Sequence, residues 1–261
     1  MKENLNKGKK LQHDIDLIIV FAQKDLKVRY KNSFLGYLWS VGHPLAFAIV
    51  FYIAFKLIMR VPIENYALFL ICGLFPWQWF SNSVNASPMI FLGNAQIIKK
   101  ISFPRNIIPF ALVLHDMLHF ILAVPVIIAF LYSSALKPHL SWIVGIPILI
   151  LAQFCLTYGI SLIIASINLF FRDLERLTVI FINILFYATP VFYSETMIPS
   201  RYELFLKLNP LTPLIINWRG LFLKGIILWD SIILSLCYGI IFLAIGLVIY
   251  KKLSWRFAEV L

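Results

Sequence analysis

Residues 142–171 read WIVGIPILILAQFCLTYGISLIIASINLFF, and this stretch decides the class of fold. It contains no Asp, Glu, Lys or Arg, and it exceeds the roughly 20 apolar residues that a helix needs to cross a bilayer. The whole chain of 261 residues is similar, with 61% hydrophobic and only 13% charged residues. A soluble domain carries about 45–50% apolar and about 25% charged residues. We therefore expect a membrane protein, and the composition excludes a soluble enzyme or a disordered chain.

Five further apolar runs flank this stretch, three before it and two after it. We interpret each as a membrane span: Gly36 to Met59, Tyr66 to Ala86, Ile107 to Tyr132, Leu177 to Tyr193, and Ser231 to Tyr250. Together the six runs predict an all-α integral membrane protein with six transmembrane helices. We expect a single domain over 1–261, made of a cytoplasmic N-terminal segment (1–35), a six-span bundle (36–250) and a cytoplasmic tail (251–261). Residues 1–35 lack the long apolar region of a signal peptide.

The distribution of positive charge predicts the orientation of the bundle. If both termini are cytoplasmic, the segments on that side hold 16 of the 23 Lys and Arg residues. Basic residues collect in cytoplasmic loops, so this orientation is the expected one. The formal net charge of +11 is then largely a signal of topology, and no nucleic-acid partner is needed to explain it.

Residues 12–31 predict an amphipathic helix at the inner membrane interface. Apolar residues recur there at spacings of three and four, including Ile15, Ile18, Ala22 and Leu26, while lysines lie elsewhere around the helix. Such a helix would lie on the membrane and lead into the first span. It would serve as a simple anchor, or it would hold a partner or a lipid headgroup.

The outer segment 194–230 is too long and too apolar for a simple connection. Its stretches Tyr202–Leu208 and Leu214–Leu223 are helical in pattern, are separated by two prolines, and are each too short to span. We interpret them as two short re-entrant helices that cap the outer face. Asp230 would be the N-cap of the last span.

Two inner loops carry features that suggest protein contacts. The first consists of Lys99, Lys100, Ile101, Ser102, Phe103, Pro104 and Arg105. Apolar residues rimmed by charge at a solvent-facing bend predict a protein contact, although Phe103 could equally dip into the lipid headgroups. The second loop, residues 172–176, alternates its charges and would pair internally or across an interface.

Two charged residues lie well inside the apolar runs. Lys56 is a few residues from the outer end of the first run, so its amine would snorkel to the interface. Asp116 lies roughly 14 Å into the third run, where a carboxylate needs a partner or a proton. We expect Asp116 to hydrogen-bond polar groups of a neighbouring helix, with Gln153 and Thr157 at a similar depth. A role in proton relay is the alternative.

Aromatic residues make up 16% of the chain, and Phe47, Phe51 and Phe55 form a stripe at four-residue spacing in the first run. Tyr52 lies beside this stripe, and Phe181, Phe186 and Tyr187 lie in the fifth run. One interpretation is a lipid-facing or packing stripe. The other is a wall of rings on which sugars slide, because the apolar face of a sugar stacks on an aromatic ring.

The sequence contains no motif that would bind a nucleotide or a metal. It has no G-x-x-x-x-G-K-[ST] loop and no soluble domain large enough to hydrolyse a nucleotide. Its three cysteines lie in apolar runs without ligand-like spacing, so we expect them to be packing residues. Energy for uphill transport would then come from another chain or from an ion gradient. The contact-like first inner loop favours another chain.

Several groups of residues form an ordered set of motifs. They are Lys24-Asp25-Leu26-Lys27-Val28-Arg29-Tyr30-Lys31 with Ser33, Leu35-Gly36 and Trp39, then Phe103-Pro104-Arg105 with Pro109, then Phe171-Arg172-Asp173, then Ala188-Thr189-Pro190-Val191-Phe192-Tyr193, and finally Asn209-Pro210 with Arg219. This order resembles that of ABC-2 type permeases that export polysaccharides, over nearly the whole chain. The closest resemblance is to O-antigen (Wzm-type) permeases, with teichoic-acid and capsule permeases as near relatives.

The resemblance implies a machine in which this chain has no cofactor and no catalytic residue of its own. Two copies of the chain would form a homodimer, joined by two copies of a separate ABC ATPase that binds ATP and Mg²⁺. The assembly would lie in the bacterial inner membrane, with both termini of this chain in the cytoplasm. It would export a polysaccharide linked to undecaprenyl diphosphate through a channel at the homodimer interface.

The resemblance also implies roles for particular residues. The loop Lys99–Arg105, together with Arg172 and Asp173, resembles the element that couples to the ATPase. The lipid diphosphate would meet Lys27, Arg29, Tyr30 and Lys31, although these positive charges could equally bind anionic lipid headgroups. The outer gate would include Pro190, Asn209, Pro210 and Arg219.

Two other functions compete with export driven by a partner ATPase. A membrane-embedded enzyme acting on lipid-linked sugars would need polar catalytic groups clustered at one face of the membrane. Asp173 and Glu175 are a close inner pair of carboxylates between two spans, and their Arg neighbours favour structural ion pairs. A proton-coupled carrier would depend on Asp116 and would transport without ATP.

Overall fold

The computed structural model describes residues 12, 16–17, 20–21, 38–101 and 103–260. Within these ranges all regular structure is helical. Ser102 lies outside the described residues, as does most of the helix expected at 12–31. The same holds for Lys27, Arg29, Tyr30 and Lys31, so their expected contact with a lipid diphosphate stays a prediction.

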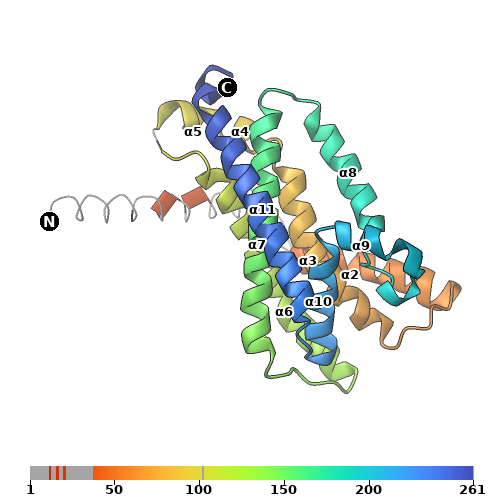
Figure 1. Ribbon diagram of the computed structural model, residues 1–261. Coiled ribbons are helices and arrows are strands. Elements are labelled where there is room, and N and C mark those ends of the chain that lie inside the picture. The colour runs from red at the N-terminus through yellow and green to blue at the C-terminus, as the bar shows by residue number, and fades with distance from the viewer. Residues whose placement is uncertain (1–11, 13–15, 18–19, 22–37, 102, 261) are drawn as a thin grey trace.

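Each of the six apolar runs forms a helix. They are α2 (Leu38–Phe51), extended by a π-helical turn over Tyr52–Ile58, α3 (Tyr66–Ala86), α6 (Ile107–Ser133), α7 (Trp142–Asn168), α8 (Leu174–Ala188) and α11 (Trp229–Leu253). Three of them, α6, α7 and α11 with its continuation, are long and apolar enough to cross a membrane. The fold is therefore an all-helical bundle of the membrane type (Figure 1).

The fifth helix departs furthest from its expected bounds. It was expected from Leu177 to Tyr193, but α8 begins at Leu174 and ends at Ala188. Thr189 is extended, with φ −102° and ψ 137°, because the residue before a proline is pushed out of the helical region by Pro190. The chain after α8 is thereby released to cross the outer face of the bundle.

Shorter helices lie at both ends of the bundle. They are α4 (Ile90–Gly93), α5 (Ala95–Lys100) and α12 (Phe257–Val260) at one end, and α9 (Glu203–Leu208) and α10 (Thr212–Lys224) towards the other. Figure 1 places α5, the C-terminus and the turn between α7 and α8 together at the top. The predicted inner loops and tail therefore share one end, and α9 and α10 occupy the stretches expected for the two short outer helices.

The N-cap expected at Asp230 is wrong. Leu228 occupies the N-cap of α11, without a side-chain hydrogen bond, and Asp230 lies within the first turn. A carboxylate there still faces the positive end of the helix dipole.

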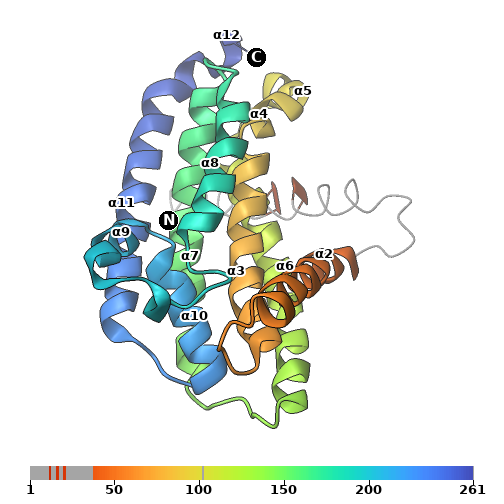
Figure 2. The same cartoon turned by 90° about the vertical axis from the view of Figure 1, so that its right-hand side faces the viewer.

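The closest helix pair is α7 with α11, which lie side by side along their length in Figures 1 and 2. Glycines permit this approach: a Cβ atom on Gly159 would lie 2.5 Å from the backbone nitrogen of Leu243, and one on Gly246 would lie 2.6 Å from the Gly159 carbonyl oxygen. Small residues at such contacts let helix backbones pack closely in membranes. Close packing matters there because lipid is as apolar as the side chains, so the hydrophobic effect does not drive the helices together.

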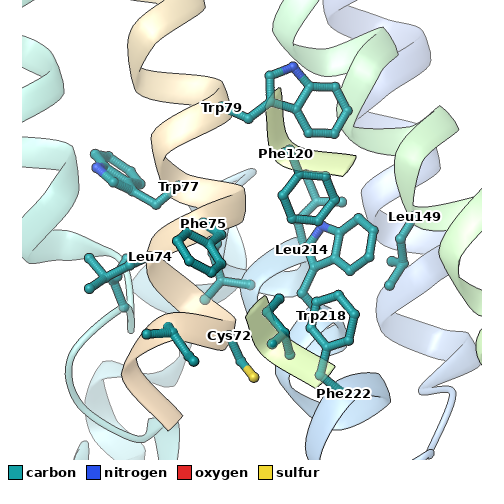
Figure 3. Close-up of a cluster of buried hydrophobic side chains, with 14 of the residues drawn as sticks. Cys72, Leu74, Phe75, Trp77, Trp79, Phe120, Leu149, Leu214, Trp218 and Phe222 are labelled. Carbon is teal, nitrogen blue, oxygen red and sulfur yellow. The ribbon is translucent and has the colours of Figure 1, made fainter. Parts of the chain in front are cut away.

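Helix α3 passes through the centre and is buried over most of its length. On one side a column of rings connects it to α6 and α10: Trp79, Phe120, Trp218 and Phe222 lie with successive centroids 5.6, 4.8 and 5.3 Å apart (Figure 3). The Trp218 indole donates to Gln153 Oε1 (2.6 Å), and Gln153 Nε2 donates to the Pro76 carbonyl (2.8 Å). This core holds α3 in place, and it therefore also sets the position of the opposite face of that helix.

Candidate functional site

A groove of about 550 Å³ lies between α2, α3 and α8. Its lining residues are His43, Phe47, Phe51, Leu74, Trp77, Gln78, Ser81, Asn85, Ile182, Asn183, Phe186 and Tyr187. The five residues from α3 recur at intervals of three and four, so they share one face of that helix. Trp77 points away from the column of rings in Figure 3, towards α8. The groove therefore occupies the side of α3 that the core leaves uncovered.

Aromatic rings form one wall of the groove. Phe51 lies 5.7 Å from Phe186 and 6.4 Å from Phe47, and Trp77 lies 5.3 Å from Phe186, measured between ring centroids. Of the aromatic residues singled out in the sequence, Phe47, Phe51, Phe186 and Tyr187 line this groove. Because these rings come from both α2 and α8, the aromatic pattern of either helix alone does not reveal the wall.

The other three aromatic residues singled out lie elsewhere. Phe55 joins the outer end of the wall by stacking on Phe51, with centroids 5.8 Å apart. Tyr52 lines a separate apolar pocket between α2, α3 and α6. Phe181 is 53% exposed and is not part of the groove lining.

Phe192 closes the outer end of the aromatic wall, and sequence reasoning gave it no separate role. Its ring stacks on Phe51 at 5.5 Å and 12°, and it lies 5.1 Å from Phe55 and 5.6 Å from Phe186. The preceding break at Pro190 brings it there. Its place in the motif ending at Tyr193 was the only sequence signal.

Neutral polar side chains form the rest of the groove, and they too were missed. Gln78 Nε2 lies 3.3 Å from His43 Nδ1, and Asn85 Nδ2 donates weakly to Ser81 Oγ at 3.5 Å. Asn85 and Asn183 are exposed in the single chain. The spacing of Gln78, Ser81 and Asn85 within an apolar run was the signal that could have revealed a polar helix face.

The residues expected at the outer gate meet at one place. The Arg219 guanidinium donates through Nη2 to the carbonyls of Pro190 (2.9 Å) and Val191 (2.8 Å). Asn209 Nδ2 donates to Thr189 Oγ1 at 2.9 Å. Pro210 follows Asn209 in the turn that begins α10. The end of α8 is thus fastened to α10 by side chains that are distant in the sequence.

Arg219 is a buried cation, with 6% of its surface exposed. Its Cζ lies 3.6 Å from the centroid of the Phe69 ring, and among the described residues no group hydrogen-bonds to Nε or Nη1. Burial lowers the pKa of the guanidinium to about 10, and the charge of Glu195 opposes this shift. Arg219 therefore stays protonated at neutral pH, and its attachment to the outer segment is charge-assisted.

Glycine 73 makes room for the guanidinium. A Cβ atom at this position would lie 2.8 Å from Arg219 Nη2 and 3.0 Å from the Val191 carbonyl oxygen. The contact between α3 and the outer segment therefore depends on the absence of a side chain at residue 73.

At the inner end, the first loop presents charge more than apolar surface. Lys99, Lys100 and Ile101 are exposed. The exposed Ile/Phe pair expected from the sequence is only half present, because Phe103 is partly buried, with its ring 5.6 Å from that of Phe21. Phe103 packs inward since it faces an apolar cluster at the inner ends of α6 and α7.

The C-terminal tail is fastened to the same loop. Arg105 Nη1 donates to the Ser254 carbonyl at 2.7 Å. The Phe257 side chain is fully buried, with its ring 5.0 Å from Phe91 and 5.9 Å from Tyr250. Loop and tail therefore form one packed unit, whereas Arg172 and Asp173 of the second loop are exposed.

Asp116 is buried in α6, and its hydrogen-bonding helix differs from the one expected. Ser83 Oγ of α3 donates to Asp116 Oδ2 at 2.8 Å. Gln153 instead hydrogen-bonds the Pro76 carbonyl of α3 and the Trp218 indole of α10. Two neighbouring histidines add to this polar cluster, with His115 Nε2 and His119 Nε2 3.1 Å apart. The sequence did not predict Ser83 as the partner of Asp116, because the depth of a residue along its helix does not tell which faces of two helices meet.

Replacing Asp116 by alanine is expected to lower the free energy of unfolding by about 1–3 kcal/mol, because the buried Ser83 hydroxyl loses its acceptor. Thermal unfolding of the purified chain in detergent measures this. Asp230→Ala, at an exposed site, is the matched control. Unchanged stability, expression and activity of Asp116→Ala would exclude both a structural role and a proton relay.

Neither metal nor redox chemistry is indicated by the residues that the structure describes. Among them, no group of three or more His, Cys, Asp or Glu side chains is placed to hold a metal ion. Cys72, Cys155 and Cys237 are free.

Long apolar helices around a groove of rings and neutral polar groups define a multi-helix membrane protein. Residues 16–223 match the family model described as ABC-2 type transporter, and the chain belongs to this family. It is 50% identical over 94% of its length, and over 95% of the relative's, to an O-antigen export system permease protein RfbA of Klebsiella pneumoniae. The family comprises transport permeases rather than enzymes.

More distant relatives are also transport proteins. The chain is 32% identical to an O-antigen export system permease protein RfbA of Myxococcus xanthus, over 79% of this chain and 80% of the relative. It is 25% identical to the polysialic acid transport protein KpsM of Escherichia coli, over 87% and 90% of the two chains.

Proposed function

We propose that this chain is the permease subunit of an ATP-driven exporter of O-antigen polysaccharide linked to undecaprenyl diphosphate. The groove between α2, α3 and α8 carries the proposal, because it combines stacked rings with neutral hydrogen-bonding groups. Rings suit the apolar faces of sugars and amides suit their hydroxyls. The names of the most similar relatives agree with it. Teichoic acid or capsule polysaccharide is the alternative cargo.

The channel would lie between two copies of the chain in the inner membrane. Helix α8 is exposed along most of its length, including Leu177, Ile180 and Ile184, and with α2 it frames the open side of the groove. Pairing two such faces would join two grooves into one passage and cover apolar surface. Six spans, with both termini in the cytoplasm, complete this arrangement.

The outer end of the passage would be closed by the segment from Pro190 through α10. Phe192 fills the end of the aromatic wall, and Arg219 and Asn209 hold the segment to the end of α8. In this proposal α9 and α10 are re-entrant helices, and the contact at Arg219 breaks when the polymer passes.

The inner loop with the tail would receive the motion of a partner ATPase that binds ATP and Mg²⁺. Lys99 and Lys100 end α5 at an exposed site, and Arg105 ties the loop to the tail at the end of α11. A push on the loop would therefore move α6 and α11 together. The lipid diphosphate would be met by Lys27, Arg29, Tyr30 and Lys31.

Charge reversal at Lys99→Glu and Lys100→Glu tests the coupling. We expect polymer-stimulated ATP hydrolysis by the reconstituted complex to fall by about tenfold, since two contacts with an acidic partner surface become repulsive. Arg105 is left intact because it packs within the inner cluster.

The matched control reverses Lys137 and Lys224, which are exposed at the opposite end of the bundle. It should leave stimulation unchanged. If the Lys99 and Lys100 variant binds the ATPase and is stimulated like the wild type, this loop is not the coupling element. If the wild-type chain neither co-purifies with an ATPase nor responds to polymer, the proposed function fails.

A further inference from the structure

The polar half of the groove contains five side chains whose selectivity among polymers the proposed function does not specify: His43, Gln78, Ser81, Asn85 and Asn183. We propose that this polar rail binds the hydroxyl groups of an uncharged sugar polymer and discriminates against polymers with a carboxylate or phosphate in each repeat. The inference rests on the proposed function and names the chemical class of its cargo.

The depth of the rail requires a polar occupant. Asn183 is nine residues into α8, or roughly 14 Å, and Gln78 is eight residues, or roughly 12 Å, from the end of α3 at Ala86. An amide exposed to hydrocarbon at such a depth costs several kcal/mol. Asn183 is exposed at this depth in the single chain, and Asn85 is exposed one residue from the end of α3. Lipid is therefore a poor neighbour for Asn183, and a hydrated polymer is a good one.

The spacing of the rail suits a moving chain. Gln78, Ser81 and Asn85 follow one another by about 4.5 and 6 Å along the axis of α3, opposite a wall formed by Phe51, Phe186 and other rings. Each amide both donates and accepts, as a sugar hydroxyl does. Hydrogen bonds are therefore exchanged from one rail residue to the next, without a deep binding site that would hold the polymer.

The charge of the lining sets the class of polymer. None of the twelve described residues that line the groove is Asp, Glu, Lys or Arg. An anionic repeat would lose water here without gaining a countercharge, which is expensive in a medium of low dielectric constant. An uncharged repeat meets no such cost.

Leucine substitutions of the two exposed amides test the rail. In the complex reconstituted with its ATPase, Asn85→Leu with Asn183→Leu is expected to slow export of a neutral undecaprenyl-diphosphate-linked polysaccharide by about tenfold. The conservative pair Asn85→Gln with Asn183→Gln should recover most of the rate. Thermal stability should be equal in both variants. Export by the leucine variant at the wild-type rate overturns the rail while leaving the proposed function standing.

A second arm tests the selectivity for charge. The wild-type complex is given the same lipid carrying either a neutral polymer or one with a carboxylate in each repeat, and the neutral polymer should be exported at least about tenfold faster. Equal rates overturn the claim that the lining selects uncharged cargo, and export of neither polymer overturns the proposed function itself.

A third measurement separates the polymer from a second copy of this chain as the occupant. If Asn85→Cys side chains of two copies cross-link equally fast with and without polymer, the groove is a subunit contact and the rail is overturned. Protection of this cysteine from a water-soluble thiol reagent when polymer is added supports the rail.

Discussion

Arg219→Ala is expected to detach α10 from the chain that follows α8 at Pro190 and Val191, and to make the closed protein leak. The variant loses two charge-assisted hydrogen bonds, to the carbonyls of Pro190 and Val191, and the contact with the Phe69 ring. Hydrogen bonds to charged groups contribute about 1.5–3 kcal/mol each, and a desolvated cation–π contact about 2 kcal/mol. Part of this loss is offset because the alanine variant no longer buries a charge. We expect a net loss of about 3 kcal/mol.

Two measurements check this expectation. Thermal unfolding in detergent reports the stability, and ion flux into liposomes reports the closure at the outer face. Arg201→Ala removes an exposed arginine from the same outer segment and should change neither. Arg219→Lys should be intermediate, because an ammonium keeps the charge but lacks the planar fork of the guanidinium. A stable and tight Arg219→Ala variant would contradict the role of Arg219 as the fastener of the gate.

Gly159→Leu is expected to abolish the folded protein. Even its Cβ atom would lie 2.5 Å from the backbone nitrogen of Leu243 and 2.6 Å from the Phe242 carbonyl oxygen. These are backbone atoms of α11, so they cannot move aside as a side chain would, and the helix pair must separate. Overpacking that side chains absorb costs about 1–3 kcal/mol, and a clash between backbones exceeds that range.

The measurement is the yield of monodisperse protein after membrane extraction and size-exclusion chromatography. Gly93→Leu is the matched control, because in the described part of the chain the Cβ position at residue 93 meets open space rather than another helix. Its yield should equal that of the wild type. A normal yield of Gly159→Leu would show that α7 and α11 do not pack as described.

The helices were predictable because their signals are local. The apolar run from Tyr66 to Ala86 became α3 with the same bounds, and the run starting at Ile107 became α6. The error at the fifth helix also has a local cause, since Pro190 ends α8 earlier than hydrophobicity alone suggests. Chain-local physics therefore accounts for almost all of the helical structure in the described residues.

The contents of the groove were less predictable. The sequence showed a stripe of rings in α2 and singled out three aromatic residues of α8, but it did not assign Trp77 and Phe192, which complete the wall, to the same surface. Asp116 was expected to meet Gln153 or Thr157 at its own depth, and the structure pairs it with Ser83 of another helix. Depth along a helix follows from counting residues, whereas the direction of a side chain around the helix depends on what packs there.

The sequence by itself determined that this protein is a helical membrane protein, which stretches form its main helices, and, through an ordered set of motifs, its family. Only the tertiary structure decided which face of each helix meets protein and which borders the groove. In a bilayer, lipid-facing and core-facing residues are equally apolar, so the sequence does not distinguish the buried side chains from those that face lipid. Only polar residues indicate a particular helix face. Gln78, Ser81 and Asn85 do so in α3, because contact with hydrocarbon is costly for them. Their partners on α2 and α8 became visible only when the three helices were placed around one groove.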